Sequence, residues 1–281
     1  MPLAHQVTLR PLESRQECLA CVSLQQEIWG PEFVDVVPAT ILMVTQRVGG
    51  VAVGAFDTHG CLVGFVFGIS GVADGVLAHW SDMLAVRPEA RRIGLGRRLK
   101  LYQREQLLEH DIRVAYWSYD PLMAVNASFN LNALGACPTE YVDDMYGDTG
   151  SILHHGLDTD RLIVKWQLDG PGIERRVAGK RHASRPDSIA GTPLVLPGPA
   201  GSGVANRARP TSDLVRIAVP ADIVSLKATN PAEARRWQRS ARHAFGIYLK
   251  NGYRVVDFYD GSKTEPPAYV LTSQPRSGSG D

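Results

Sequence analysis

Two periods of apolar residues run through the chain, and each period predicts one type of element. Stretches in which apolar residues alternate with polar ones, or form short runs, predict strands. Stretches in which apolar residues return every three or four positions predict helices, and Gly or Pro ends most of them. Over the first 168 residues, the predicted strands are 6–12, 51–56, 61–69, 77–86, 112–119, 139–146 and 161–168. The predicted helices are 13–29, 38–48, 95–110 and 122–134.

The pattern is lost over residues 169–210, where Gly, Pro, Ser, Ala and Arg dominate. This composition is typical of a linker or an extended strap, and the apolar piece 193–197 inside it is a candidate to dock onto a sheet. Order then returns, with predicted strands at 214–219, 254–259 and 268–272, a short turn or helix at 222–228 and a long helix at 231–251. The sequence therefore predicts three parts, which are a first domain at 5–168, a linker or strap at 169–210 and a C-terminal αβ extension at 211–273.

The turn between strand 77–86 and helix 95–110 carries the most specific chemistry. Two arginines and two glycines lie in it, Arg91, Arg92, Gly94 and Gly96, and a second arginine pair follows. A helix start attracts anions through its unpaired backbone N–H groups, and glycine lets a phosphate approach the main chain, so the turn suits a pyrophosphate. Leu99 stands where a dinucleotide fingerprint needs its third glycine, and a Walker Gly-Lys-Ser/Thr is absent. The alternative is an ordinary strand-to-helix turn with solvated arginines.

The motif Arg91-x-x-Gly94-x-Gly96, preceded by Val86-Arg-Pro-Glu, resembles the acyl-CoA-binding motif of the GNAT N-acyltransferase superfamily. The predicted order of elements over residues 5–168 is also the GNAT order. The resemblance implies an α+β fold of three α/β/α layers, with a mixed, mostly antiparallel sheet and helices on both faces. The segment at 117–122 and those after it look like an uncharacterised bacterial branch, part of which is linked to N-succinylation of amino acids.

The resemblance also implies how the co-substrate, acetyl-CoA or another acyl-CoA, is held. Backbone groups of Leu84 and Val86 would pair with the pantetheine arm, and the Asn126 side chain on the next helix could hydrogen-bond it. Consecutive residues of the turn would hold the pyrophosphate: Arg91, Arg92, Ile93, Gly94, Leu95, Gly96 and Arg97. GNAT proteins usually transfer the acyl group by direct attack of the amine, without an acyl-enzyme intermediate.

His79 and Asp82, on the strand before the turn, are the candidate general bases. His79 has an unperturbed pKa suited to proton transfer near neutral pH, and Asp82 could act through a water. A lone His or Asp on a strand is more often structural or solvated. The usual GNAT acid is a tyrosine four residues before the glycine that ends the helix, and Leu131 stands at that position here. Three other tyrosines could substitute for it, namely Tyr141, Tyr146 and Tyr248.

Arg161 is the candidate substrate residue, because a guanidinium can clamp a substrate carboxylate in a bidentate pair. An internal pair with Asp158 or Asp160 that shapes the loop is the open alternative. No metal is expected, since His154 and His155 have no companion ligands at metal spacing.

Composition narrows the choice of partners. Of the 281 residues, 44% are hydrophobic, which is ample for a globular core. With 30 Lys and Arg against 29 Asp and Glu, the charge gives no reason to expect nucleic acid or a membrane surface. The sequence shows neither a secretory signal pattern nor a long apolar span, so a cytoplasmic protein is expected. The oligomeric state is open, with a homodimer as one option.

The expected function is the transfer of an acetyl or succinyl group from coenzyme A to a primary amine of a small molecule, with an amino acid as one candidate. The alternative is a non-catalytic GNAT-like module that binds CoA or serves assembly, which the residue at 131 favours. A protein-modifying acetyltransferase ranks lower, because the sequence shows no acidic cluster for a lysine-bearing segment. Residues 214–272, with Tyr248 four positions before Gly252, could be a worn partial GNAT repeat or an unrelated appendage.

Overall fold

The computed structural model describes residues 7–154, 156–170, 172–179, 189, 191–197 and 212–274. The chain forms two compact units that are not contiguous in sequence. Unit 1 consists of Met1–Trp117, Asp148–His155 and Lys165–Val177, and unit 2 consists of Ser118–Gly147, Gly156–Val164 and Ala178–Asp281. The three predicted parts, with boundaries at 168 and 210, are contiguous in sequence, unlike these two units. That division of the chain stays a prediction.

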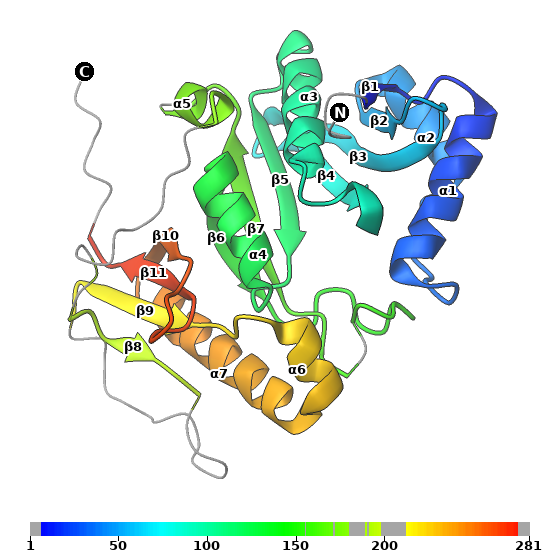
Figure 1. Ribbon diagram of the computed structural model, residues 1–281. Helices are drawn as coiled ribbons and strands as arrows, with labels where there is room; N and C mark the ends of the chain where they lie inside the picture. Colours follow the sequence, from blue (N-terminus) through cyan, green and yellow to red (C-terminus); the bar gives the residue numbers. More distant parts are fainter. Residues whose placement is uncertain are drawn as a thin grey trace. The chain divides into compact units, whose positions relative to one another are not determined.

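The helices and strands follow the predicted order closely (Figure 1). The elements wholly in unit 1 are β1 (Thr8–Pro11), α1 (Arg15–Trp29), α2 (Ala39–Thr45), η2 (Gln46–Val48), β2 (Val51–Phe56), β3 (Leu62–Ala73), β4 (Val76–Val86), η3 (Pro88–Ala90), α3 (Leu95–Glu109) and α5 (Ile173–Val177). Those wholly in unit 2 are α4 (Ala124–Ala127), the π-helix η4 (Ser128–Leu134), β6 (Cys137–Val142), β8 (Leu194–Val195), β9 (Leu214–Ala218), α6 (Ile223–Thr229), α7 (Pro231–Lys250), β10 (Arg254–Tyr259) and β11 (Ala268–Thr272). Strands β5 (Val114–Tyr119) and β7 (Arg161–Gln167) belong to both units by their residue ranges.

The large sheet has the strand order β1-β2-β3-β4-β5-β7-β6. Strands β1 to β4 are antiparallel neighbours. Strands β4 and β5 run parallel, with His79 opposite Ala115 and Trp80 opposite Tyr116. This mixed, mostly antiparallel sheet and the order of the elements confirm the predicted GNAT-like α+β fold.

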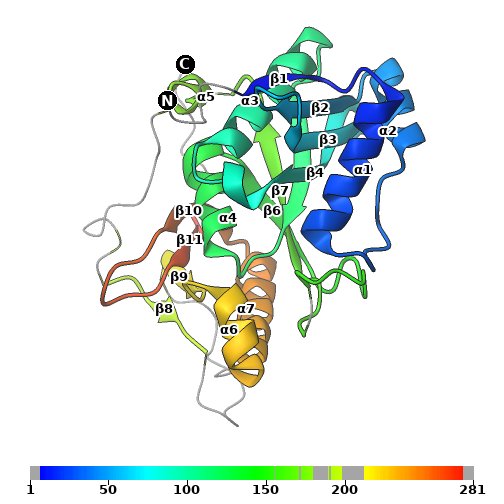
Figure 2. The same cartoon turned by 45° about the vertical axis from the view of Figure 1, so that its right-hand side comes forward.

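Helices α1 and α2 cover one face of β2, β3 and β4 in unit 1 (Figure 2). Leu24 of α1 and Leu42 of α2 are fully buried there in a cluster that includes Phe65 of β3. The neighbouring residue, Gly64, faces α3 instead, because a Cβ on it would lie 3.5 Å from Leu99 Cδ1. Since successive strand residues point to opposite faces, α3 covers the other face, as predicted.

Strand β4 contains a bulge directly after its pairs with β5. Phe67 of β3 lies opposite Met83, whereas Ile69 lies opposite Trp80, so β4 advances three residues while β3 advances two. A bulge of this kind re-aims the side chains around it and is common beside functional sites. The extra residue falls between Trp80 and Met83, in the segment that holds Asp82.

Unit 2 contains a second sheet with the order β10-β11-β9-β8. The apolar piece of the predicted linker does dock onto a sheet, because Leu194 pairs in parallel with Arg216 of β9. Aromatic rings fill the interior of this unit. Phe245 of α7 stacks on Tyr141 at a centroid distance of 5.1 Å and meets the edge of Tyr269 at 5.2 Å.

Three details differ from the prediction. The helix expected at 122–134 is a short α-helix followed by a π-helix, and the linker contains the unpredicted helix α5, whose Ile173 is buried. Strand β6 ends at Val142 and not at residue 146. Its continuation is a turn in which the Asp144 N–H donates to Asp160 Oδ1 at 3.1 Å, a contact that a local pattern does not contain.

Candidate active site

The turn between β4 and α3 includes two residues in the left-handed backbone conformation. Arg92 has a φ of 64° and Gly94 a φ of 77°, and a Cβ on Gly94 would meet nothing within 4 Å. Glycine is therefore favoured there for its backbone freedom and not for lack of space. Arg91 Nε donates a 2.9 Å hydrogen bond to the carbonyl oxygen of Val86, which ties the turn to the end of β4.

The amides at the start of α3 are arranged as an anion requires. Gly94 is the N-cap residue, and it offers no side chain to the first helical N–H groups. The first backbone bond into the helix runs from Arg98 N to Gly94 O at 3.0 Å, and within the described residues the N–H groups from Arg92 to Arg97 have no protein acceptor. Such consecutive amides at a helix start are typical of anion-binding sites. The turn thus fits the predicted pyrophosphate, and its assignment stays a prediction.

The arginines of the turn play unequal parts. The Arg97 side chain donates to the carbonyl oxygen of Val177 at 2.8 Å, and that of Arg98 donates to the carbonyl oxygen of Val7 at 2.7 Å. Arg92 is exposed and, in the described part of the chain, its side chain makes no hydrogen bond. Besides the amides, Arg92 is therefore the group best placed to meet an anion.

The predicted pantetheine residues adjoin the turn in unit 1. Leu84 and Val86 pair with Val66 and Gly64 of β3. Leu84 Cδ2 lies 3.8 Å from the position that a Cβ on Gly96 would take, so the end of β4 and the first turn of α3 are neighbours. A single extended ligand could therefore follow β4 and end at the amides.

Asp82 lies on β4 in the segment of the bulge, and its side chain is exposed. Its carboxyl pKa is nevertheless raised. The largest cause is desolvation by nearby protein atoms, the charge of Asp35 adds to it, and a hydrogen bond with the Trp80 side chain opposes it. An accessible carboxylate with a raised pKa is suited to proton transfer.

His79 lies in a different setting, with no exposed surface. Gln103 Nε2 lies 3.0 Å from His79 Nε2, and since the amide nitrogen can only donate, this ring nitrogen accepts. His79 Nδ1 then carries the hydrogen and donates to Ser70 Oγ at 3.0 Å, while Ser70 donates to Gly49 O at 2.7 Å. Burial, together with the charge of Lys100, lowers the pKa of His79 to about 3. These contacts favour a structural histidine over the predicted general base.

Lys100 is a buried polar residue that the sequence analysis did not single out. Only 2% of it is exposed, and its Nζ donates to Ser81 Oγ at 2.8 Å and to Gln103 Oε1 at 3.2 Å. Its third contact is with the Trp117 ring, whose centroid lies 3.7 Å from Lys100 Nζ. Burial lowers the Lys100 pKa well below its usual value. The sequence contained a signal for this buried polar cluster. Gln103, which binds Lys100, lies four residues after the apolar Leu99 and so on the same face of the helix.

Leu131 occupies the helix position at which the usual GNAT acid, a tyrosine, was sought. Leu131 is buried in η4 and Gly135 ends the helix in the left-handed conformation, with its N–H bonded to Asn130 O. Asn126 lies in α4 and is partly buried. Its role toward the pantetheine arm stays a prediction, as do those of Leu84 and Val86.

The three candidate tyrosines differ in their freedom to act as acids. The hydroxyl of Tyr141 donates to Asp160 Oδ2 at 2.7 Å, and burial raises its pKa far above the usual range. Burial also raises the pKa of Tyr248. Tyr146 is 40% exposed, and its hydroxyl lies 2.8 Å from Ser118 Oγ. Of the three, Tyr146 combines an exposed side chain with a hydroxyl partner, Ser118, that can relay a proton.

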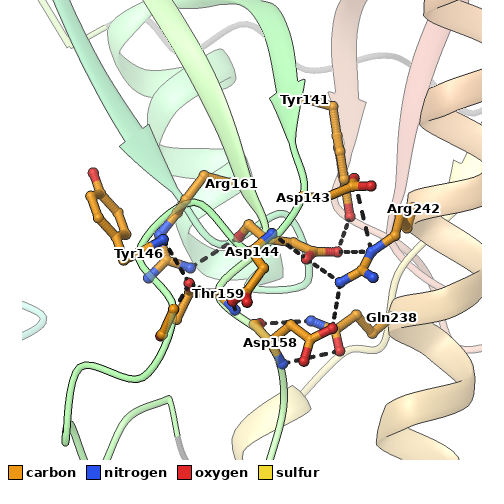
Figure 3. Close-up of polar contacts among 11 residues, drawn as sticks. Tyr141, Asp143, Asp144, Tyr146, Asp158, Thr159, Arg161, Gln238 and Arg242 are labelled. Carbon is orange, nitrogen blue, oxygen red and sulfur yellow. Dashed lines mark hydrogen bonds and ion pairs between the residues drawn. The ribbon is translucent and has the colours of Figure 1, made fainter.

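Arg161 begins β7 and is 6% exposed. Its Nη1 donates to the carbonyl oxygen of Asp160 at 2.9 Å, and its Cζ lies 5.3 Å from the ring centroid of Tyr146. Asp158 and Asp160 form ion pairs with Arg242 of α7, which therefore takes part in shaping the loop (Figure 3).

Among the described residues, no group of three or more His, Cys, Asp and Glu side chains is placed to bind a metal ion. None of the helices described here combines the length and the apolar character needed to span a membrane.

Several solved acetyltransferase structures resemble this fold. An Escherichia coli N-acetyltransferase of a ribosomal-protein alanine covers 59% of this chain and 96% of its own, with a TM-score of 0.45 and 16% identity. A Salmonella typhimurium protein assigned as an acetyltransferase, solved with its cofactor acetyl-CoA, covers 64% and 97%, with a TM-score of 0.45 and 17% identity. A Desulfovibrio desulfuricans protein assigned to the GNAT family covers 58% and 99%, with a TM-score of 0.45 and 17% identity. No family model and no curated protein matches the sequence.

The order of the elements, the order of the strands and the turn before α3 define a GNAT-like fold, which leaves a further region with a second small sheet.

Proposed function

We propose that the protein transfers an acyl group, acetyl or succinyl, from coenzyme A to a primary amine of a small molecule, with an amino acid as the candidate acceptor. The observation that carries the proposal is the row of amides from Arg92 to Arg97, which have no protein acceptor within the described residues. Consecutive amides at a glycine-containing helix start, beside an exposed arginine, suit a pyrophosphate.

Each part of the co-substrate has residues to hold it in this proposal. The turn residues 91–97 bind the pyrophosphate, and backbone groups of Leu84 and Val86 hold the pantetheine arm, with Asn126 as a further partner. When bound, the co-substrate supplies an acyl group activated as a thioester. The amine nitrogen forms a bond to the acyl carbon, the carbon–sulfur bond breaks, and the thiolate leaves.

Asp82 is the general base of this proposal and takes the proton that the amine loses, through a water molecule. It is exposed and its pKa is raised, whereas His79 is buried with both ring nitrogens engaged. Tyr146, which is 40% exposed, is one candidate acid for the leaving thiolate, beside Tyr141 and Tyr248. The alternative, a CoA-binding module without catalysis, is favoured by one observation, the buried Leu131 at the usual tyrosine position.

Calorimetry with acetyl-CoA and succinyl-CoA tests the binding step. The double variant Arg92→Glu, Gly94→Asp should abolish binding, because it places two carboxylates among the amides. Arg47→Glu with Gly60→Asp is the matched control, since Arg47 is exposed and Gly60 is also left-handed with no atom within 4 Å of an added Cβ. Failure of the native protein to bind either thioester would remove the foundation of the proposal.

Thioester-dependent release of CoA in the presence of amines separates an enzyme from a binding module. Removing a general base typically costs 10²–10⁴-fold, so we expect Asp82→Asn to lower kcat by roughly that factor and to change the pH–rate profile. His79→Gln should leave the profile of activity against pH unchanged. An unaltered profile in Asp82→Asn contradicts the assigned base, and binding without release in any amine supports the module.

A further inference from the structure

Strands β4 and β5 are paired over a short stretch only. Within unit 1, His79 lies opposite Ala115 and Trp80 lies opposite Tyr116, and the described pairs end there. Strand β4 nevertheless continues to Val86. Among the described residues of unit 1, the edge of β4 that faces β5 therefore has no strand partner beyond Trp80.

This edge of β4 presents polar backbone groups. The Arg87 N–H donates to the carbonyl oxygen of Val63 of β3 at 2.9 Å. Such bonds alternate along an antiparallel pair, so the N–H and C=O groups of Leu84 and Val86 point away from β3. On that side, the carbonyl oxygen of Val86 accepts from the Arg91 side chain. An extended ligand that follows β4 would meet these groups, as the proposed function requires of the pantetheine arm.

Lys100 of α3 lies at the point where the paired stretch ends. Ser81 follows Trp80 in β4, and its Oγ accepts from Lys100 Nζ at 2.8 Å. Trp117 follows Tyr116 in β5, and its ring centroid lies 3.7 Å from the same nitrogen. A single ammonium thus contacts the first residue of each strand beyond the last pair.

The surroundings hold this ammonium in place. Lys100 and Ser81 are buried, and Gln103, one turn further along α3, accepts from Lys100 Nζ at 3.2 Å. The Trp117 ring meets the edge of the Trp166 ring of β7 at a centroid distance of 5.8 Å. In a close-packed interior a displaced side chain displaces its neighbours. The position of Lys100 is therefore coupled to the positions of both strands.

We propose that Lys100 is a positioning residue that ties β4 to β5 where their pairing ends, and so holds the edge of β4 from Leu84 to Val86 in place for the pantetheine arm. The inference rests on the proposed function, because that function supplies the arm. Lys100 takes part in no chemical step. An arm that meets a pre-organised strand binds more tightly than one that must order the strand itself.

Calorimetry with two ligands separates the arm from the rest of the co-substrate. Acetyl-CoA and adenosine 3′-phosphate 5′-diphosphate, the part of CoA that lacks the arm, are titrated against the native protein and Lys100→Met. The variant should raise the Kd of acetyl-CoA about three- to tenfold, the value of one hydrogen bond, and leave the Kd of the nucleotide unchanged. A general disturbance of α3 would weaken both ligands, because the anion turn begins this helix. Equal weakening of both, or an unchanged Kd for acetyl-CoA, overturns the role.

Two further variants sharpen this test. Glu105→Met, an exposed position on the same helix, is the matched control and should change neither Kd. Ser81→Ala removes the hydroxyl that Lys100 contacts, so it should weaken acetyl-CoA in the same direction. If both side chains act through one tie, the double variant should bind acetyl-CoA no more weakly than Lys100→Met. Additive losses would contradict a shared tie. Should Lys100→Met not fold, Ser81→Ala with both ligands provides the same comparison.

Hydrogen exchange tests the tie without any ligand. In Lys100→Met, the amides of residues 79–83 and 114–117 should exchange faster than in the native protein, because the ends of the paired stretch are less firmly held. The amides of β2 should be unaffected. Unchanged exchange at both segments overturns the tie, whether or not the protein binds acyl-CoA. Faster exchange in a protein that binds no acyl-CoA would refute the proposed function and the positioning role together, and leave only a structural tie.

Discussion

Unit 1 contains a buried cation and unit 2 a half-buried one, and the two units compensate the charge in opposite ways. Lys100 in unit 1 has only neutral partners, the Ser81 hydroxyl, the Gln103 amide and the Trp117 ring, and its pKa is lowered. Arg242 in unit 2 meets the carboxylates of Asp158 and Asp160, and its pKa is raised.

The difference indicates what each cluster can do. Neutral partners leave the charge of Lys100 weakly supported, so this cluster mainly fills and orders the interface between β4 and α3. The polar interior of unit 1 is therefore a packing feature, whereas that of unit 2 is a network of ion pairs around the buried carboxylate of Asp160.

The largest effect is expected from Arg242→Ala. It leaves the buried Asp160 carboxylate without its cation, and breaking such a pair costs about 3–5 kcal/mol. The free energy of unfolding, measured with urea, should fall by that amount. Arg239→Ala on the same helix is the control, since an exposed side chain should matter by no more than about 0.5 kcal/mol. Equal losses in the two variants would show that the network adds nothing to stability.

The next effect concerns pH in unit 1. The pKa of His79 is about 3 in the folded protein and 6.5 ordinarily, so the folded state binds this proton less tightly than the unfolded state. The stability that comes from neutral His79 is complete above pH 6.5 and is lost as pH falls toward 3. Between pH 7 and 4.5, the native protein should lose about 2–3 kcal/mol more than His79→Gln. Parallel losses would mean that His79 is solvated.

A smaller effect is expected from Tyr141→Phe. The ring still stacks on Phe245, but Asp160 loses one of its four hydrogen bonds. A bond to a charged group contributes about 1.5 kcal/mol or slightly more, which urea unfolding can resolve. Tyr116→Phe provides the matched control, because the Tyr116 hydroxyl has no hydrogen bond within the described residues. If the free energy of unfolding falls no more than in the control, Arg242 stabilises the Asp160 carboxylate without help from Tyr141.

The smallest effect is expected from Lys100→Met. The change replaces a desolvated ammonium by an apolar side chain of similar shape. Ser81 can still donate to Gln103 Oε1 at 3.0 Å. Losing the hydrogen bonds of the ammonium lowers stability, and removing its desolvation cost raises it. The free energy of unfolding at neutral pH should therefore change by about 1 kcal/mol or less. A loss as large as that of Arg242→Ala would end the contrast between the two clusters. Thermal and urea unfolding of the two variants side by side provide the measurement.

Much of the fold could be predicted because its signals are local. The period of apolar residues placed nearly every helix and strand, and the glycine that ends α7, Gly252, lies where the pattern stops. The bulge of β4 could not be predicted in this way, because residues 77–86 read as one continuous strand. Only the register against β3 shows that the strand contains an extra residue.

The candidate site was predicted unevenly for the same reason. The turn from Arg91 to Arg97 is a short motif whose chemistry depends on neighbouring backbone amides, so it can be predicted from the sequence. The choice between His79 and Asp82 depends on burial, and burial is a property of the packed strand. The partners of Asp160, which include Arg242, are set by contacts far along the chain.

The sequence by itself determined the order of the elements, the GNAT-like class of fold and the position of the glycine-containing turn that is the candidate anion site, since these depend on residues a few positions apart. Only the tertiary structure decided that Asp158 and Asp160 pair with Arg242, that His79 is shielded and that Asp82 is open. Electrostatic pairing depends on distances between side chains and on the water around them, and folding fixes both.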